Sequence, residues 1–343
     1  MEKMRAAFLV KKGNAHEAFQ LREAPIPVPS AGQVLIRSEV FGLNFAEIPM
    51  RYGMYREAPE MPFIPGYDMV GRVEAVGNDV DEKWIGKRVA AMARFGTYAE
   101  YCATPVSGIS EISESMPAAK ASAIGVQYTT AYYAAIFSMN LIPRDKVLIH
   151  AGAGGVGSAL IQLCKWKGAT VFATVGSNAK MERARELGAD HVINYREEDY
   201  EAACKKILGK SRLDATFNPI AGSTFKKDLR LLGSGGRLAL YGAAQRMGQK
   251  GGKLATYRFL WKMGLLMPIL LMAKSRAVIG INILKIADHR EHVIQHCFDE
   301  LIKLHEQEII DPPVGGEFPI EKLAEAHEML ENRKTMGKLV VRW

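Results

Sequence analysis

The sequence lacks several features that would settle its class at once. Its 343 residues include only four cysteines, which are widely separated at Cys102, Cys164, Cys204 and Cys297. This spacing matches neither a disulfide framework nor a CxxC metal motif, so we expect four reduced thiols. The N-terminus also lacks the long apolar run of a signal peptide. Together these absences predict a cytoplasmic protein.

Long apolar runs and basic stripes are scarce as well. The most apolar stretch, residues 257–272, is interrupted by Lys262, Gly264 and Pro268, and we expect it to be too short and too broken to span a bilayer. No basic stripe with interleaved aromatic residues appears, which argues against nucleic-acid binding. Lys and Arg still exceed Asp and Glu by 45 to 37, a net charge of +8 that favours anionic ligands such as a phosphate-rich cofactor.

The first part of the chain, from Arg5 to about Gly125, consists of short apolar runs punctuated by Gly and Pro. Such runs predict an all-β unit. The clearest of them are residues 6–10, 34–42, 69–76 and 89–92.

The rhythm changes after this β unit. Strand-like runs begin near Val147, Thr170, Val192, Asp214 and Arg237, with helical patterns between them. Strand, helix and strand in alternation predict right-handed crossovers and a parallel, doubly wound α/β sheet. We expect a helix over 156–167, a last strand over 277–284, helices over 289–306 and 320–332, and a closing strand over 338–341. The tail should fold back onto the N-terminal β unit.

A glycine turn lies between the first of these strands and its helix. Gly152, Gly154 and Gly157 form a G-x-G-x-x-G pattern after the run that begins at Val147. We expect Gly152 to permit the tight turn, Gly154 to let a pyrophosphate approach the backbone, and Gly157 to let the helix pack on the strand. The helix N-terminus would then offer N–H groups to the phosphates. An ordinary glycine-rich loop is the alternative, which the flanking strands and helix disfavour.

The end of the second strand bears on the choice of cofactor. An NAD site places Asp or Glu about 20 residues past the glycine motif, to bind the ribose 2′-hydroxyl. This sequence has Gly176 and Ser177 there, followed by Lys180. A 2′-phosphate could take a hydrogen bond from Ser177 and a charge from Lys180, which predicts NADPH as the cofactor. Alternatively, Ser177 caps the next helix and Lys180 is a solvated surface residue.

The residues also resemble a known family. The chain is similar, over essentially its whole length, to the zinc-free medium-chain dehydrogenase/reductases of the NADPH:quinone oxidoreductase group, and the region after Gly242 is more similar to the VAT-1-like branch. The segments that carry the resemblance are Gly42-Leu-Asn-Phe-Ala-Glu47, Arg51-Tyr-Gly-Met-Tyr55, Pro65-Gly-Tyr-Asp-Met-Val-Gly71, Gly86-Lys-Arg-Val89, Thr130-Ala-Tyr-Tyr133, Ala153-Gly-Gly-Val-Gly157, Val192-Ile-Asn-Tyr195 and Gly337-Lys-Leu-Val-Val341.

This resemblance implies a fold and a set of contacts. A GroES-like β domain would comprise residues 1–124 and 285–343, and a Rossmann NADP-binding domain residues 125–284. The resemblance places Asn44 and Thr130 at the nicotinamide end and Gly155 and Val156 at the pyrophosphate. It further assigns Ser177, Lys180, Tyr195 and Arg333 to the adenosine phosphate, and Tyr241, Gly242, Ala243 and Ala244 to the cofactor groove. It also implies a homodimer. The chain departs from the family at Pro49, often a tyrosine, and at Asn218, often an aspartate.

Catalytic zinc lacks its usual ligands by the same comparison. Zinc-dependent relatives have a Cys ligand where Asn44 stands and a Gly-His-Glu triplet where Gly66-Tyr67-Asp68 stands, so we expect no metal. Three histidines, at 289, 292 and 296, are interpreted as a solvated helix surface. Without a Lewis acid, the acceptor must already be electrophilic, such as a quinone or a conjugated enone or enal. Tyr55 and Tyr67 are candidate proton donors, with Asn44 as a third candidate catalytic residue.

The stretch from Leu254 to Met272 allows several interpretations. We expect one or two short helices, and the favoured role is core or subunit packing. The alternatives are a lid over the substrate site or an interfacial membrane contact in which Arg258 and Lys262 meet lipid head groups. The leading hypothesis for function is an NADPH-dependent reductase of quinones or conjugated carbonyls. The second is a weakly catalytic, NADPH-binding protein that acts at membranes or binds a partner.

Overall fold

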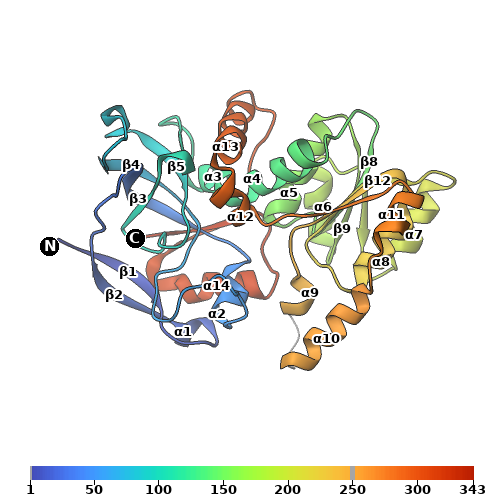
Figure 1. The fold of residues 1–343 in the computed structure, drawn as a ribbon, viewed down its shortest axis with the longest axis horizontal. Helices are drawn as coiled ribbons and strands as arrows, with labels where there is room; N and C mark the ends of the chain where they lie inside the picture. Colours follow the sequence, from blue (N-terminus) through green and yellow to red (C-terminus); the bar gives the residue numbers. More distant parts are fainter. Residues whose placement is uncertain (1, 248–251) are drawn as a thin grey trace. The chain divides into compact units, whose positions relative to one another are not determined.

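The computed structural model describes residues 2–247 and 252–343, and they form two compact units. The end unit contains Met1–Thr129 and Ile283–Trp343, and the central unit contains Thr130–Asn282. The end unit is therefore built from both ends of the chain, as Figure 1 shows by its blue and red colours. These limits lie close to the domain boundaries expected at 124/125 and 284/285. The functions expected for the two domains stay predictions.

The end unit is built around a seven-stranded sheet with the order β14-β15-β3-β4-β5-β7, in which β6 also pairs with β3. Its strands are β3 (Gln33–Leu43), β4 (Asp68–Val76), β5 (Arg88–Met92), β6 (Tyr101–Pro105), β7 (Ile109–Glu111), β14 (Val314–Pro319) and β15 (Lys338–Arg342). A separate antiparallel pair consists of β1 (Lys3–Leu9) and β2 (Phe19–Pro25). Strand β15 lies antiparallel to β3, which confirms that the tail folds back onto the N-terminal β unit.

Several short helices cover this sheet. They are α1 (Ala15–Ala18), α2 (Glu47–Arg51), α3 (Ala118–Ala123), α12 (Ile283–His289), α13 (Glu291–Glu306) and α14 (Leu323–Glu331). The apolar face of the sheet, which includes Val34, Ile36, Phe41 and Met69, packs in one buried cluster with Leu323 of α14. The core therefore joins residues from the two ends of the chain, and β3 and β4 are packed into it.

The central unit is a parallel six-stranded sheet with the order β10-β9-β8-β11-β12-β13. Its strands are β8 (Lys146–His150), β9 (Thr170–Val175), β10 (His191–Asn194), β11 (Leu213–Asn218), β12 (Leu232–Leu240) and β13 (Ala277–Gly280). The order reverses between β8 and β11, and in doubly wound sheets ligands bind outside the carboxyl ends of the strands at such a point. The predicted parallel α/β sheet is confirmed.

Helices connect the strands of the central unit (Figure 1). They are α4 (Thr129–Tyr132), α5 (Gly155–Trp166), α6 (Asn178–Glu186), α7 (Tyr200–Leu208), α8 (Ser223–Leu231), α9 (Ala244–Met247), α10 (Gly252–Met263) and α11 (Pro268–Ala273). Helix α5 matches the expected helix over 156–167 to within a residue at each end. Its residues Leu160, Ile161 and Leu163 are fully buried, as the apolar periodicity requires.

Three expectations about the elements are wrong in part. The strand expected over 277–284 ends at Gly280, because Ile283 already begins α12. The helix expected over 289–306 begins only at Glu291, as α13, because His289 still belongs to α12. The first 125 residues are not wholly β, since α3 and the π-helical turn at Ile124–Tyr128 follow β7. Runs of small residues such as Ala118–Ala123 have no strand periodicity, and they pack closely against β3 and β15.

Candidate cofactor and active site

The glycine turn after β8 has the geometry of a phosphate-binding turn. The structural role of Gly152 in it differs from the expectation. The residue in the left-handed region is Ala151, with φ of 54°, and not Gly152. Gly152 is needed for packing, because a Cβ there would lie 2.9 Å from the Cβ of Ala173 on β9. Its N–H donates to the Thr174 carbonyl at 3.0 Å, which fixes the turn to the neighbouring strand.

Gly157 and Gly154 differ in the space around them. A Cβ on Gly157 would overlap the Ala151 carbonyl, so only glycine allows α5 to pack against the turn. A Cβ on Gly154 would meet only the Ala151 oxygen, at 3.2 Å, so the protein itself leaves this side of the turn open. Gly155 and Val156 begin α5, and the first N–H groups of a helix have no intrahelical partners. The turn therefore presents N–H donors to an anion.

At the carboxyl end of β9 the structure brings together four of the predicted cofactor residues. Tyr195, which directly follows β10, lies over Gly176 so closely that a Cβ there would stand 2.6 Å from the Tyr195 hydroxyl. Ser177 occupies the N-cap position of α6, yet its side chain makes no capping hydrogen bond. Lys180 lies half-buried in the first turn of that helix. Ser177 therefore occupies the capping position but does not make the capping hydrogen bond that the alternative expected. Its hydroxyl can donate to another acceptor.

The end of β12 contributes Tyr241, Gly242 and Ala243. Gly242 approaches the backbone of the loop after β11, because a Cβ there would lie 2.7 Å from the Pro219 carbonyl oxygen. The hydroxyl of Tyr241 is buried and makes no hydrogen bond to any described residue. Burial raises its pKa well above the usual value, so it stays protonated. Ala243 accepts from the Arg246 N–H at 2.9 Å, which begins α9.

A network of buried hydrogen bonds holds the loop after β11 in place. Asn218, at the end of β11, accepts from the backbone N–H groups of Ile220 and Ala221, each at 2.8 Å. Its amide donates to Asp228 at 2.6 Å, and Asp228 also contacts His150 of β8 at 3.0 Å. Sequence reasoning noted Asn218 only as a departure from the family pattern. The structure gives it a role, because an amide can bridge the loop and a buried carboxylate.

In the end unit, Asn44 is held by a network of buried polar groups. Its amide Nδ2 donates to Asp68 at 2.6 Å, and its Oδ1 accepts from the Lys338 ammonium at 3.1 Å. Lys338 also pairs with Asp68 at 2.7 Å, and both side chains are fully buried. A Cβ on Gly42 would overlap Asp68 and Lys338, so this glycine makes room for the ion pair. These partners were missed, although Asp68 and Lys338 both lie within the motifs of the resemblance.

Glu47 extends the network towards α14. It accepts from the Asn44 N–H at 2.8 Å and from the Tyr98 hydroxyl at 2.6 Å, and Tyr98 also contacts His327 Nε2 at 2.9 Å. Burial raises the pKa of Glu47 to about 8. Burial lowers the pKa of His327 to about 3. Near neutral pH the network therefore contains one ion pair, Asp68 with Lys338, beside a protonated Glu47 and a neutral imidazole.

The two candidate tyrosines lie next to each other in the end unit. Tyr55 is half-buried and Tyr67 is buried, with ring centroids 6.4 Å apart in an edge-to-face arrangement. The Tyr67 hydroxyl makes no hydrogen bond of ordinary geometry to a described residue, although the two phenols influence each other's pKa. Burial raises the pKa of both, so each phenol is protonated near neutral pH.

The remaining predicted residues are distributed between the units. Thr130 is buried in α4, at the start of the central unit. Arg333 belongs to the end unit, where it is exposed after α14 with φ of 57°. The structure thus gathers twelve predicted residues along the carboxyl ends of the central strands: Gly152, Gly154, Gly155, Val156, Gly157, Gly176, Ser177, Lys180, Tyr195, Tyr241, Gly242 and Ala243. Asn44, Tyr55, Tyr67 and Arg333 belong to the end unit.

The residues that would replace a zinc site are engaged with one another. Asn44 and Asp68 share a hydrogen bond, and the ammonium of Lys338 lies within hydrogen-bond distance of both. Within 2–247 and 252–343, no group of three or more His, Cys, Asp or Glu side chains is arranged to hold a metal ion. The histidines at 289, 292 and 296 belong to α12 and α13.

Known proteins resemble this chain over its whole length. Residues 30–143 match the alcohol dehydrogenase GroES-like domain, and residues 155–299 match the zinc-binding dehydrogenase family. The human synaptic vesicle membrane protein VAT-1 homolog is 35% identical over 94% of this chain and 82% of its own length. Human quinone oxidoreductase is 30% identical over 99% of this chain and 98% of its own length.

A solved structure agrees with these relatives. A mycobacterial protein determined in complex with NADPH superposes with a TM-score of 0.85 and 29% identity, covering 99% of this chain and 100% of its own. The expected fold class, a GroES-like β domain with a Rossmann-type parallel-sheet domain, is confirmed.

Proposed function

The chain belongs to the medium-chain dehydrogenase/reductases of the VAT-1 and quinone oxidoreductase type, a family of oxidoreductases, and from that premise we propose an NADPH-dependent reductase of quinones or conjugated enones and enals that works without zinc. One observation carries the choice of cofactor. The Ser177 hydroxyl stands at a helix N-terminus without a capping bond, at a strand end that has no acidic residue. A 2′-phosphate fits there, whereas a carboxylate at this point would repel it.

The residues of the central unit would bind the cofactor as follows. Gly154, Gly155 and Val156 would hold the pyrophosphate, because the open side of the turn and the helix N-terminus present N–H groups there. Ser177, Lys180 and Tyr195, with Arg333 and the strand end at Gly176, would surround the adenosine phosphate. Tyr241, Gly242 and Ala243 would line the groove, and Thr130 would approach the nicotinamide. Bound NADPH would supply a hydride.

The end unit would act as the catalytic domain. It would orient the acceptor and supply the proton. Asn44 is fixed in one orientation by Asp68 and Lys338, which suits a residue that positions the nicotinamide. Tyr67 has a protonated hydroxyl beside the phenol of Tyr55, so it can donate a hydrogen bond to a carbonyl oxygen that gains electrons. Tyr55, half-buried beside it, would connect that hydroxyl to solvent.

The absence of a Lewis acid in this proposal restricts the substrate. Without a metal, the enzyme cannot easily polarise an alcohol or a simple ketone, whereas a quinone or a conjugated enone is already electrophilic. Where zinc-dependent relatives have a Cys ligand and a Gly-His-Glu triplet, this chain has Asn44 and Gly66-Tyr67-Asp68, and the ammonium of Lys338 is bonded to Asn44 and Asp68. Metal analysis of the purified protein by mass spectrometry, with activity measured after chelator treatment, tests this point. Loss of activity on chelation would contradict it.

The decisive experiment is an acceptor panel. Oxidation of NADPH and of NADH is followed in parallel with quinones, enones, 2-enals and simple ketones. We expect turnover with the first three classes, a preference for NADPH, and none with ketones. Replacement of Tyr55 and Tyr67 by Phe should lower the rate and alter its pH profile, and an unchanged profile would remove both from the mechanism.

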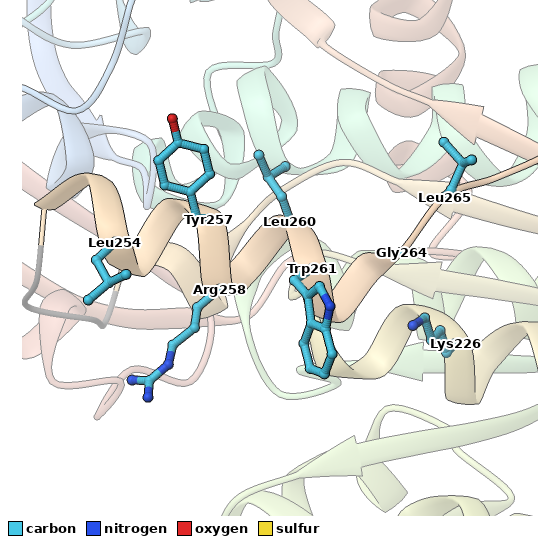
Figure 2. Close-up of a pocket in the computed structure, with 8 residues that line it drawn as sticks. All are labelled: Lys226, Leu254, Tyr257, Arg258, Leu260, Trp261, Gly264 and Leu265. Atoms are coloured by element: carbon cyan, nitrogen blue, oxygen red, sulfur yellow. The ribbon is translucent and has the colours of Figure 1, made fainter.

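A second candidate function is a weakly catalytic NADPH-binding protein that acts at membranes or binds a partner. A specific observation favours it, since the large apolar side chains of Leu254, Trp261 and Leu265 are exposed in the central unit (Figure 2). The favoured expectation of core packing is therefore wrong for these residues within the chain. The stretch Leu254–Ala273 passes by length and composition as a membrane-crossing helix, although it is broken between Met263 and Pro268. The relatives named as vesicle membrane proteins are consistent with it. Tight NADPH binding without turnover of any acceptor would support this candidate over the first. A homodimer in the cytoplasm is compatible with either, and sedimentation analysis measures the oligomeric state.

A further inference from the structure

The strand end proposed to bind the 2′-phosphate has no acid of its own, yet a carboxylate from the next strand lies close to it. Helix α6 begins at Asn178, directly after Ser177, and its first turn contains no acidic residue. The N-terminus of a helix carries a partial positive charge, which favours a negative group nearby. Glu197, in the loop after β10, supplies that negative group.

Asn194 connects the loop to the helix. It is the last residue of β10, and its side chain is buried. Its amide nitrogen donates to Glu197 Oε1 at 2.7 Å and to Asn178 Oδ1 at 3.3 Å. Because both oxygens accept from one nitrogen, the Glu197 carboxylate lies beside the side chain of the first residue of α6. A buried group therefore sets the position of this carboxylate.

The backbone of this loop is fixed as well. The Asn194 carbonyl accepts from the Glu197 N–H at 3.0 Å, and the Asn194 side-chain oxygen accepts from the Arg196 N–H at 3.2 Å. The Tyr195 N–H donates to the Val175 carbonyl at 3.1 Å, which joins the start of the loop to the end of β9. The bonds that hold Tyr195 at the proposed phosphate site thus hold Glu197 there too.

The Glu197 carboxylate has no counter-charge of its own. Glu197 is exposed, and it forms no ion pair with any residue of 2–247 or 252–343. Only one of its oxygens accepts a hydrogen bond there, from Asn194. Such a group can accept a hydrogen bond from a ribose hydroxyl, as the acid of an NAD site does, whereas it repels a phosphate.

We propose that Glu197 is a specificity-determining residue of the cofactor site, which accepts a hydrogen bond from the adenosine ribose of NADH and opposes the 2′-phosphate of NADPH. The acid that is missing from the end of β9 is thus supplied by the loop after β10. The protein therefore binds both dinucleotides, and its preference for NADPH is smaller than Ser177 and Lys180 alone would give. The inference rests on the proposed function, because it assigns Glu197 to the adenosine end of the same site.

Fluorescence titration of Glu197→Gln with NADPH and with NADH tests the inference. Gln can still accept the hydrogen bond from Asn194, so only the charge is removed. NADPH should bind about fivefold more tightly, because a carboxylate no longer faces the phosphate, and added salt should reduce this gain. NADH should bind about fivefold more weakly, because a neutral amide is a poorer acceptor than a carboxylate. The ratio of NADPH to NADH affinity should therefore rise at least about tenfold.

Glu198→Gln is the matched control, because it removes the next charge along the chain from an exposed side chain that makes no hydrogen bond to Asn194. Its affinity ratio should equal that of the wild type. An unchanged ratio in Glu197→Gln, in a wild-type background that prefers NADPH, would overturn this inference alone, since the carboxylate would then serve only the N-terminus of α6. A wild-type protein that binds neither dinucleotide would contradict the proposed function together with the inference.

Discussion

The hydroxyl of Tyr195 lies over Gly176, so close that a Cβ on Gly176 would stand 2.6 Å from it. The ring is thereby seated on the carboxyl end of β9, next to Ser177, where the 2′-phosphate is proposed to bind. This contact depends on the absence of a side chain at 176. It gives a direct way to disturb the adenosine end of the site without touching the glycine turn.

Replacement of Gly176 by Ala should weaken NADPH binding about tenfold, a change of about 1.4 kcal/mol, because Tyr195 must move aside. Fluorescence titration with NADPH measures the effect. The control is Gly280→Ala on β13, where an added Cβ meets nothing within 4 Å, and we expect unchanged affinity there. Equal affinity of the two variants would argue against Tyr195 as a cofactor residue.

Two glycines of the turn should respond in opposite ways. Gly157→Ala forces a Cβ into the Ala151 carbonyl, so it should lower the free energy of unfolding by about 1 to 3 kcal/mol. Gly154→Ala brings a Cβ to 3.2 Å from the Ala151 oxygen, a close contact that a small shift relieves, so it should lower the melting temperature much less than Gly157→Ala, yet it should weaken NADPH binding at least about tenfold. Denaturant unfolding and NADPH titration of both variants separate the effects. A Gly154→Ala protein with normal affinity would mean that the pyrophosphate binds elsewhere.

Ser177 and Lys180 should set the preference for NADPH over NADH. Ser177→Asp places a carboxylate at the proposed phosphate position, so the ratio of NADPH to NADH affinity should fall at least about tenfold through like-charge repulsion. Lys180→Ala should weaken NADPH but spare NADH. Ser177→Asn is the control, because it adds bulk without charge. If the Asp and Asn variants keep the same cofactor ratio, the 2′-phosphate does not lie at this strand end.

Glu47 should make stability depend on pH. Its pKa is about 8 in the folded protein against a usual value of 4.5, so the folded state holds a proton that the unfolded state has lost. Its contribution is fully present below pH 4.5 and is lost as the pH rises towards about 8, with a slope of at most about 1.4 kcal/mol per pH unit.

Glu47→Gln keeps the hydrogen bonds of the acid form and cannot ionise. Urea unfolding of both proteins between about pH 7 and about pH 9 should therefore show a flatter profile for the variant. His327, with its pKa of about 3, adds an opposite loss of stability below its usual value of 6.5, so the comparison is made above that pH. Parallel profiles for the two proteins would show that Glu47 ionises normally.

Asn218 should not tolerate the aspartate that its relatives often carry. Asn218→Asp would place a second carboxylate 2.6 Å from Asp228 in a buried network, which should cost about 1 to 3 kcal/mol of unfolding free energy. The exchange Asn218→Asp with Asp228→Asn restores one amide and one carboxylate, and we expect it to recover much of the loss. Denaturant unfolding of the single and double variants measures the coupling. Additive losses would show that the two residues act independently.

The sequence predicts local patterns better than it predicts packing partners. The parallel sheet, its strand starts, helix α5 and the return of β15 to the N-terminal unit follow from periodicity, spacing and resemblance. The strand after Arg276 is shorter than expected, because an apolar run cannot show where a buried strand gives way to a helix such as α12. The left-handed Ala151 was also missed, since alanine gives no signal for that conformation.

The network around Asn44 could not be predicted from the sequence, for a different reason. Asp68 and Lys338 are far apart in the chain, and their contact depends on the pairing of β15 with β3 and of β3 with β4. The sequence pattern would place a lysine in an apolar closing strand at an edge, whereas Lys338 is fully buried. A lone charge in such a strand is a usable signal, because it must find a buried partner.

The arrangement of the end unit also has a consequence for synthesis of the chain. Asp68 leaves the ribosome long before its counter-ion Lys338, and the whole central unit emerges between them. The central unit is continuous and can fold as it appears, whereas the end of strand β3, at residues 41–43, has an open edge until β15 is translated. A ribosome stalled in the last part of the message would therefore expose a finished central unit beside an unfinished sheet.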